Sequence, residues 1–263
     1  MIGLFLGENE LPLKILNKIK KENINYFIID LTKNNKFKKD KKSFFISIGK
    51  FGKILDLIHS KKCKKVLFAG NIIKPTISRL KLDIKGIYYI PRILKASKLG
   101  DAAILKQLIK ILAENKIKVV KLNTYNPELT LKKGCYTKTK PSNSDKNTIH
   151  KGIKILKKIN SYNHTQALVI NDNKVISFEK KYGTKKMLKS IKKSKYKNSI
   201  LIKFPKQKQD LRVDLPTIGI DTVKDCKKAG IKGIAIKGNQ NIILNKFESI
   251  KFANSNKMFV VAI

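Results

Sequence analysis

The sequence predicts an α/β protein that consists of two α/β domains. Residues 2–6 form an apolar run that ends at Gly7, residues 11–21 show helical spacing, and residues 26–30 form a second apolar run. The order strand, loop, helix, strand is typical of a parallel α/β unit. The chain has 263 residues, 42% of them hydrophobic, and a polar stretch near its middle divides it. Each half can therefore bury a core of its own.

The first domain is expected to span residues 1–133. Pro12 favours a helix start after the first strand, because its missing N–H is not needed in the first turn. Residues 102–112 place leucine and isoleucine at helical spacing. The remaining patterns predict strands at 44–48, 66–69 and 119–122 and helices at 53–60 and 90–94. These elements predict a mainly parallel sheet.

The second domain is expected to span residues 148–263, after a polar linker rich in turn-forming residues at 134–147. Residues 171–173 separate two apolar runs and predict a hairpin turn. Gly230 is expected to end a helix. The other patterns predict helices at 149–159, 183–191 and 222–228 and strands at 167–170, 174–178, 199–204, 233–236, 241–244 and 258–262. We expect a mixed sheet with helices.

The net charge of +41 first indicates a partner such as nucleic acid. However, the chain has 56 Lys and only 3 Arg, whereas base and phosphate recognition favours the planar guanidinium. Lysine and the 39 isoleucines are both encoded by AT-rich codons, and the lysines recur along the whole length. We interpret the charge as mainly compositional. A basic nucleic-acid-binding protein without catalytic activity is the alternative interpretation.

Other features of the sequence indicate the cellular compartment and limit the kinds of site that we expect. The three cysteines lie far apart in the sequence, which predicts neither a disulfide framework nor a zinc site. No leader peptide and no run long enough to span a membrane is evident, so a soluble, cytoplasmic protein is expected. Gly3 and Gly7 form a G-x-x-x-G pattern that leads into the turn after the first strand, and Asp30 ends the second strand, which together make a partial dinucleotide-binding pattern. The interpretation of the chain as an NAD(P)-dependent oxidoreductase would depend on that pattern alone.

Four of the 11 aspartates fall within sixteen positions of this very basic chain: Asp210, Asp214, Asp221 and Asp225. Such carboxylates suit Mg²⁺, which usually takes one or two protein carboxylates and completes its shell with water and phosphate. Asp221 or Thr222 could instead cap a helix, with Thr222 and Asp225 as a capping box. Asp214 precedes Leu215 and Pro216, where no helix needs a cap. It is therefore the first candidate metal ligand, and Asp210 is the second.

The segment from Gln209 to Gly219 resembles the C-terminal motif of the UDP-2,3-diacylglucosamine pyrophosphatases of lipid A biosynthesis. Residues 3–12, 68–75 and 99–102 are similar to that family as well, so the resemblance covers essentially the whole chain. Two departures stand out. The family usually has three glycines in its first loop, where this chain has Gly7, Glu8 and Asn9. The family's Glu-Gly-Thr-Asp pattern is here residues 182–185, Tyr-Gly-Thr-Lys, which removes a possible carboxylate.

The resemblance implies a metal-dependent hydrolase that cleaves UDP-2,3-diacylglucosamine to UMP and 2,3-diacylglucosamine 1-phosphate, with a Rossmann-like N-terminal domain. Its expected cofactor is Mg²⁺ or Mn²⁺, held by Asp214 and Asp210, and a homodimer is expected. Cations beside the carboxylates, Lys203 and Arg212 among them, could clamp a pyrophosphate. Asp101 is expected to cap a helix. The predicted catalytic residues are Asp214, Asp210 and Arg212, and the predicted substrate-binding residues are Gly7, Gly70, Lys74, Gly100, Asp101, Thr184, Lys203 and Thr217.

The substrate that the resemblance implies is a lipid of the inner leaflet of the inner membrane. A basic exterior favours transient contact with such an anionic surface. We therefore expect a cytoplasmic protein with peripheral contact with that leaflet.

Overall fold

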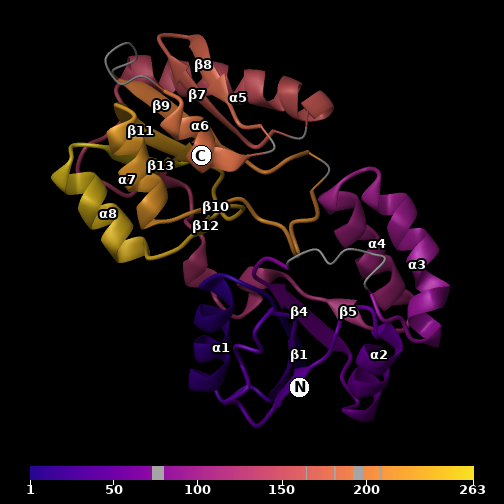
Figure 1. The fold of residues 1–263 in the computed structure, drawn as a ribbon. Coiled ribbons are helices and arrows are strands. Elements are labelled where there is room, and N and C mark those ends of the chain that lie inside the picture. Colours follow the sequence, from indigo (N-terminus) through magenta and orange to yellow (C-terminus); the bar gives the residue numbers. More distant parts are fainter. Residues whose placement is uncertain (73–79, 164, 181, 192–197, 208) are drawn as a thin grey trace. The chain divides into compact units, whose positions relative to one another are not determined.

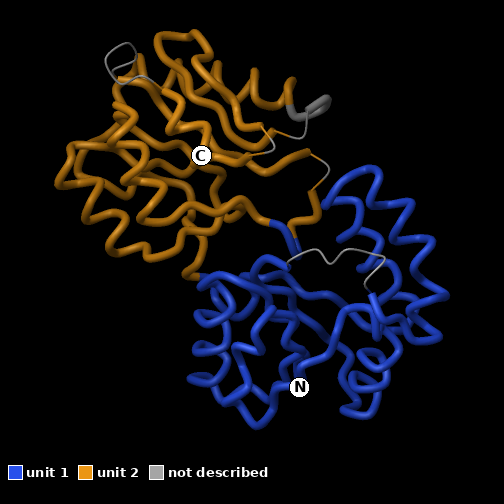
Figure 2. The backbone as a smooth tube through the Cα atoms, in the orientation of Figure 1, with its two compact units in different colours: residues 1–127, 212–214 blue, residues 128–211, 215–263 orange. Residues whose placement is uncertain are grey.

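The computed structural model describes residues 1–72, 80–163, 165–180, 182–191, 198–207 and 209–263 (Figure 1). The chain forms two compact units (Figure 2). Unit 1 comprises residues 1–127 and 212–214, and unit 2 comprises residues 128–211 and 215–263. Most of each unit thus comes from one half of the chain, but three residues of the second half belong to unit 1.

Unit 1 contains a five-stranded sheet with the order β3-β2-β1-β4-β5, and every pair of neighbours in it is parallel. This confirms the predicted mainly parallel sheet. The strands are β1 (Ile2–Leu6), β2 (Tyr26–Asp30), β3 (Ser43–Phe45), β4 (Lys65–Ala69) and β5 (Lys118–Val119). The helices are α1 (Leu11–Lys21), α2 (Phe51–Ser60), α3 (Ile84–Ser97) and α4 (Asp101–Glu114), followed by a 3-10 turn, η2 (Leu122–Thr124).

Both faces of this sheet are covered, which explains why its central strands are apolar throughout. All five residues of β1 and of β2 are buried. Alternate strand residues, such as Phe5 and Phe68, pack with α2 and α4 in one cluster. On α1, Ile15 and Ile19 belong to the buried stripe, and Figure 1 shows α1 and α2 on opposite sides of the sheet. A parallel sheet with both faces buried requires such continuous apolar strands.

Unit 2 contains a six-stranded mixed sheet with the order β6-β13-β11-β9-β7-β8 and a separate parallel pair, β10 with β12. Strands β13, β11 and β9 are parallel to one another, whereas β6, β7 and β8 pair antiparallel. The strands are β6 (Gly134–Cys135), β7 (Ala167–Asn171), β8 (Lys174–Phe178), β9 (Ser199–Lys203), β10 (Thr217–Ile218), β11 (Ile231–Ile236), β12 (Ile242–Ile243) and β13 (Phe259–Ala262). The helices are α5 (Asn143–Asn163), α6 (Gly183–Lys189), α7 (Ile220–Lys228) and α8 (Lys246–Ser255).

The hairpin between β7 and β8 confirms the turn predicted at residues 171–173. Asp172 and Asn173 both have positive φ angles, 42° and 66°, as a two-residue type I′ turn requires. Other local predictions need correction. The expected strand at 119–122 ends at Val119 and gives way to η2. The polar stretch 134–147 contains β6 and the start of α5, and α8 was not predicted.

Two predicted helix caps are wrong. Helix α7 begins at Ile220, two residues before Thr222, so Thr222 and Asp225 lie within the helix and form no capping box. Asp101 is the first residue of α4, and Gly100 takes the N-cap position with a φ angle of 101°. A carboxylate in the first turn still favours the helix through the helix dipole. Gly230, with a φ angle of 78°, ends α7 as expected.

Candidate functional site

The order of the strands in unit 1 defines a candidate binding position. The chain proceeds from β1 through β2 to β3 on one side, and then returns to place β4 and β5 on the other side of β1. In open α/β sheets, ligands bind at this reversal, outside the carboxyl ends of the two strands that flank it. Gly7 directly follows β1 and Gly70 directly follows β4. Both predicted residues therefore lie at the reversal point.

The two loops at this point are joined backbone to backbone. The Glu8 N–H donates to the Asn71 carbonyl (2.6 Å), and the Asn71 N–H donates to the Glu8 carbonyl (3.1 Å). A Cβ atom at Gly7 would overlap the Asn71 carbonyl, and Gly70 has a φ angle of 86°. Both glycines are thus required by the contact between the loops, whatever they contribute to binding a substrate.

The departure from three glycines in the first loop has a structural explanation. Asn9 has a φ angle of 77°, a left-handed conformation that asparagine tolerates better than most residues. Its Oδ1 atom accepts a hydrogen bond from the Leu11 N–H (2.9 Å). The neighbouring Glu8 carboxylate accepts from Lys36 and from the Lys33 N–H, and the Lys36 hydrogen bond lowers the pKa of Glu8. The loop therefore keeps a glycine-like backbone and adds a negative charge.

Other residues at the ends of unit 1 elements have more defined structural roles. The Asp30 carboxylate is buried and accepts from the Thr32 N–H (2.9 Å), the Thr32 hydroxyl (2.6 Å) and the Phe37 N–H (3.0 Å). Because these bonds occupy it, Asp30 does not match a ribose-binding acid, and the oxidoreductase interpretation loses its second feature. Asp101 is exposed beside Gly100. Lys74 lies outside the described residues.

The motif segment is divided between the two units. Arg212, Val213 and Asp214 belong to unit 1, whereas Asp210 and Thr217 belong to unit 2. The Arg212 carbonyl accepts from the Leu122 N–H (3.1 Å), and Val213 packs against the hydrophobic core of unit 1. The predicted catalytic residues Asp210, Arg212 and Asp214 are all half-buried.

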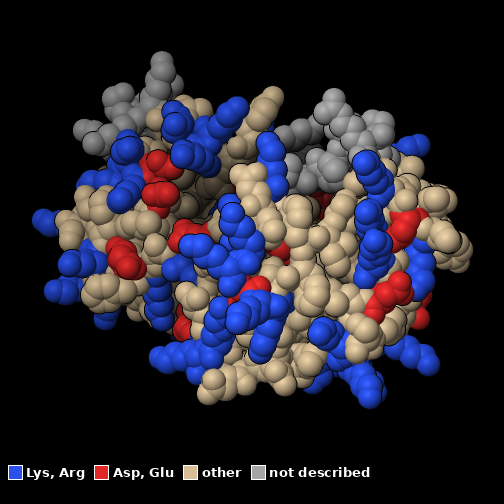
Figure 3. Space-filling model, turned by 60° about the horizontal axis from the view of Figure 1, so that its bottom comes forward, with Lys and Arg blue, Asp and Glu red and all other residues tan. Residues whose placement is uncertain are grey.

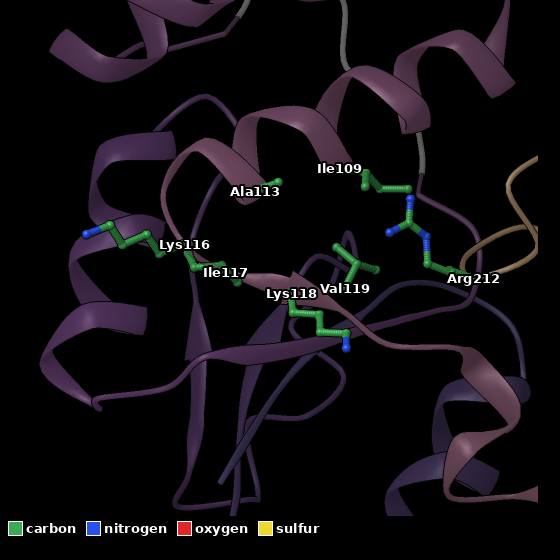
Figure 4. Close-up of a pocket in the computed structure, with 7 residues that line it drawn as sticks. All are labelled: Ile109, Ala113, Lys116, Ile117, Lys118, Val119 and Arg212. Atoms are coloured by element: carbon green, nitrogen blue, oxygen red, sulfur yellow. The ribbon is translucent and has the colours of Figure 1, made fainter.

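Arg212 lines a hollow of ≈ 240 Å³ in unit 1 (Figure 4). The figure shows its side chain extending toward Ile109 of α4. The remaining lining residues are Ala113, Lys116, Ile117, Lys118 and Val119. The lining therefore includes four apolar residues, and Figure 4 shows the Lys116 side chain extending away from Arg212.

Three of the predicted substrate-binding residues meet in unit 2. Lys203 ends β9, and its buried ammonium donates to the Thr184 hydroxyl (2.9 Å) and to the Thr217 carbonyl (3.0 Å). The Thr184 hydroxyl in turn donates to Glu179 Oε1 (2.6 Å). Lys203 therefore connects the first turn of α6 with β10, the strand that continues the motif. We call Glu179, Thr184, Lys203 and Thr217 the Lys203 cluster.

The electrostatics of the Lys203 cluster favour a fixed geometry. Burial lowers the pKa of Lys203, and the nearby Glu179 carboxylate offsets only part of that effect. A buried lysine and carboxylate joined through a hydroxyl are costly to separate, because either charge alone would remain unpaired. The cluster thus holds α6 and β10 in place.

Sequence reasoning missed Glu179, Asn241 and Gln209, all of which are buried beside predicted residues. Glu179 supplies the cluster with a carboxylate near the position where residues 182–185 lack one. The Asn241 side chain donates to the Lys203 carbonyl (3.0 Å). Gln209 Oε1 accepts from the Lys206 N–H (2.9 Å), while its buried Nε2 has no hydrogen-bond partner among the described residues. Glu179 carried one signal, since the chain has only 7 glutamates.

The donor chemistry of Asp210 and Asp214 suits a magnesium ion. Within the described ranges, no group of three or more His, Cys, Asp or Glu side chains could hold a metal ion. Mg²⁺ needs fewer protein ligands, because water and substrate phosphates complete its octahedral shell. Carboxylates such as those of Asp210 and Asp214 are a ligand type that Mg²⁺ accepts, and their role as metal ligands stays a prediction.

The fold and these positions define a class. The chain is a two-unit α/β protein with a Rossmann-like strand order in unit 1 and a buried lysine cluster beside the motif in unit 2. Residues 1–129 match the family model of the LpxI N-terminal domain, and residues 132–261 match that of the LpxI C-terminal domain. The chain therefore belongs to the LpxI family, which confirms the resemblance found in the sequence.

The similarity to a named relative extends the comparison. The UDP-2,3-diacylglucosamine pyrophosphatase LpxI of Caulobacter vibrioides is 27% identical over 226 residues. The match covers 83% of this chain and 81% of the relative. The comparisons do not support the nucleic-acid-binding alternative. Figure 3 likewise shows lysine and arginine side chains scattered over the visible face rather than gathered in one patch. Among the described helices, none is both long and apolar enough to cross a membrane.

Proposed function

We propose that this protein hydrolyses the pyrophosphate bond of UDP-2,3-diacylglucosamine, releasing UMP and 2,3-diacylglucosamine 1-phosphate in lipid A biosynthesis. The observation that carries the proposal is the match of both units to one family whose named relative is a pyrophosphatase of that substrate. In this proposal the Lys203 cluster has a positioning role, because its members already bind one another and hold α6 and β10 in place.

The chain offers distinct groups for the parts of this reaction. The reversal point of unit 1, with Gly7 and Gly70, would take the nucleotide part of the substrate. Arg212 would stabilise negative charge on the phosphate oxygens, since a guanidinium donates two parallel hydrogen bonds. Gln209 Nε2 is a buried donor available to a substrate oxygen. Asp214 would orient the attacking water, because its carboxylate accepts a hydrogen bond from that water.

We propose that the enzyme is metal-dependent, with Asp214 and Asp210 holding Mg²⁺ or Mn²⁺. The ion would neutralise the diphosphate and lower the pKa of a bound water. Mg²⁺ is the better match of the two proposed ions to a site with few protein carboxylates, because it normally retains several waters. We further propose a cytoplasmic homodimer that contacts the membrane peripherally.

The test is to incubate the purified protein with the lipid nucleotide in detergent and to measure UMP. We expect UMP release with Mg²⁺, its loss in EDTA, and recovery when Mg²⁺ or Mn²⁺ is added in excess. No UMP under any of these conditions, from a folded protein, would contradict the proposed reaction. Full activity in EDTA would contradict only metal dependence and would leave lysine and arginine as the groups that stabilise phosphate.

A further inference from the structure

The outward face of α3 in unit 1 carries large, exposed apolar side chains, which no other described residue covers. Ile84 is 87% exposed, Ile87 60% and Tyr88 70%, and Leu99 just beyond the helix is 73% exposed. Leu94 and Pro91 are exposed as well. Single exposed apolar residues are ordinary, but a contiguous group of them marks an interaction surface.

These residues form one stripe along the helix. Positions 84, 87, 88, 91 and 94 are spaced by three or four residues, which places them on one side of an α-helix. The opposite side faces the unit, where Ala96 is buried and Ile93 packs against the hydrophobic core. Helix α3 therefore differs from an ordinary surface helix, because its large apolar residues face the solvent. We call residues 84, 87, 88, 91 and 94 the α3 face.

The helix that carries the α3 face contributes only basic charges. The sequence of α3 contains no Asp or Glu. Lys85 pairs with Asp56 of α2 (3.1 Å) and Arg92 pairs with Glu114 of α4 (2.5 Å), so these cations serve the contacts of α3 with its neighbours. Lys95 and Lys98 are exposed and form no ion pair with any residue that the structure describes. By helical spacing, both lie on the apolar side.

The Asp83 carboxylate, next to this face, is directed inward. It accepts from the Gly86 N–H (2.7 Å), the Gly52 N–H (3.0 Å) and the Lys53 N–H (3.0 Å). Burial raises the pKa of Asp83, but these backbone hydrogen bonds outweigh that effect and the pKa is lowered. The carboxylate is therefore already occupied and does not offset the basic character of the α3 face.

We propose that the α3 face docks on the surface of an anionic lipid bilayer. An interfacial helix of this kind buries apolar side chains at the headgroup boundary while its lysines attract anionic lipids. A tyrosine such as Tyr88 suits that boundary, because its ring is apolar and its hydroxyl is polar. The inference rests on the proposed function for its purpose, since docking would bring the enzyme to a diacylated substrate.

Two other arrangements are less favoured by these observations. A second copy of the chain, with its own net charge of +41, would bring Lys95 and Lys98 near further lysines. Unit 2 also exposes an apolar side chain, Phe247 on α8, in a groove of ≈ 690 Å³. That surface has an exposed acid, Glu248, beside the phenylalanine. The α3 face has more exposed apolar residues and no acid.

The experiment is co-sedimentation of the purified full chain with phosphatidylcholine vesicles that contain or lack phosphatidylglycerol. We expect binding to the anionic vesicles and much weaker binding to the neutral ones. The double variant Ile84→Ser/Ile87→Ser should lose vesicle binding. Phe247→Ser, which removes an equally exposed apolar side chain from α8, should retain it. Circular dichroism of each variant checks folding.

A second pair of variants tests the charges. Lys95→Glu/Lys98→Glu should weaken binding to anionic vesicles by about tenfold or more, because each basic residue near the surface contributes to the attraction. Lys227→Glu/Lys228→Glu changes the net charge equally on exposed positions of α7 and should have a smaller effect. Equal losses for the two pairs would show that total charge, not the α3 face, drives binding, and would overturn the proposal.

Two further outcomes would also overturn it. If Phe247→Ser abolishes binding and Ile84→Ser/Ile87→Ser does not, the docking surface is on unit 2. If light scattering shows that Ile84→Ser/Ile87→Ser converts a dimer to a monomer while vesicle binding persists, the α3 face joins two copies. UMP release in detergent without vesicle binding would contradict docking alone. Vesicle binding without UMP release would contradict the proposed function alone.

Discussion

The two units place their predicted substrate-binding residues by different means. In unit 1, Gly7 and Gly70 bring two loops together through backbone hydrogen bonds at the reversal of strand order. In unit 2, Lys203 does so through side chains, with its ammonium bound to Thr184 and Thr217. A geometry made by backbone restricts only the positions where a Cβ atom would overlap a neighbour or where φ is positive, and asparagine tolerates the positive φ angle at position 9. A geometry made by buried charges depends on the identity of each partner.

The largest expected effect concerns Asp214, at the point where the motif belongs to unit 1. Asp214→Ala should lower kcat by roughly 10³-fold with little change in substrate binding, because it removes a group that acts mainly in the transition state. Asp225→Ala is the matched control from the same aspartate-rich segment. Since Asp225 lies inside α7 and caps nothing, we expect nearly full activity. Steady-state kinetics of UMP release measures both, and equal losses would show that the role of Asp214 is assigned wrongly.

The next largest effect is on stability. It follows from a substitution that disrupts the side-chain arrangement of unit 2. Lys203→Met keeps the aliphatic stem but leaves Glu179 buried without its cation. We expect a loss of about 3 kcal/mol in the free energy of unfolding at neutral pH. Urea denaturation measures it. An unchanged denaturation midpoint would show that the ammonium is dispensable for holding α6 and β10.

The difference in stability between the wild type and Lys203→Met should depend on pH, and the lowered pKa of Lys203 fixes the direction of that dependence. Because the pKa of Lys203 is lowered in the folded protein, the unfolded chain binds more protons between that pKa and the ordinary value of 10.5. Wild-type stability therefore gains a positive contribution with rising pH in that window. Lys203→Met lacks this contribution, so the stability difference between the two proteins should widen toward pH 10.5. A constant difference would contradict the lowered pKa.

The smallest expected effect is a loss of stability from a substitution that disrupts the backbone contact in unit 1. Gly7→Ala should destabilise the protein by about 2 kcal/mol, since the new methyl group overlaps the Asn71 carbonyl and the loops must separate. Gly219→Ala is the control. Its φ angle of −156° suits any residue, and the added Cβ meets Leu244 only at an ordinary contact distance of 3.4 Å. Thermal denaturation should show a lowered midpoint for Gly7→Ala alone.

Much of the fold could be predicted because burial on both faces leaves a strong signal. The apolar strands β1 and β2 and the turn at Asp172 and Asn173 were all evident in the sequence. Helix α8 was not, because its exposed Phe247 obscures the helical pattern and only Ser249 and Ala253 are buried. The caps at Asp101 and Thr222 were wrong because a glycine precedes each helix and the helix begins directly after it.

The candidate site was predictable in part. Thr184, Lys203 and Thr217 meet as a site requires, but no sequence spacing indicates that Lys203 is buried among 56 lysines. Glu179 could not be assigned, since its contact with Thr184 depends on how α6 follows β8. The assignment of residues 212–214 to unit 1 was equally hidden, because it results from a hydrogen bond to Leu122 and the packing of Val213.

The assignment of residues 212–214 to unit 1 has a consequence for constructing its parts separately. A gene segment that encodes residues 1–127 omits Val213, a side chain that packs on the core of the first unit, and the backbone partner of Leu122. We therefore expect the isolated segment 1–127 to be less stable than unit 1 is in the full chain. Exchanging the second half between homologues would therefore also change the side chain at position 213, which packs against the core of unit 1.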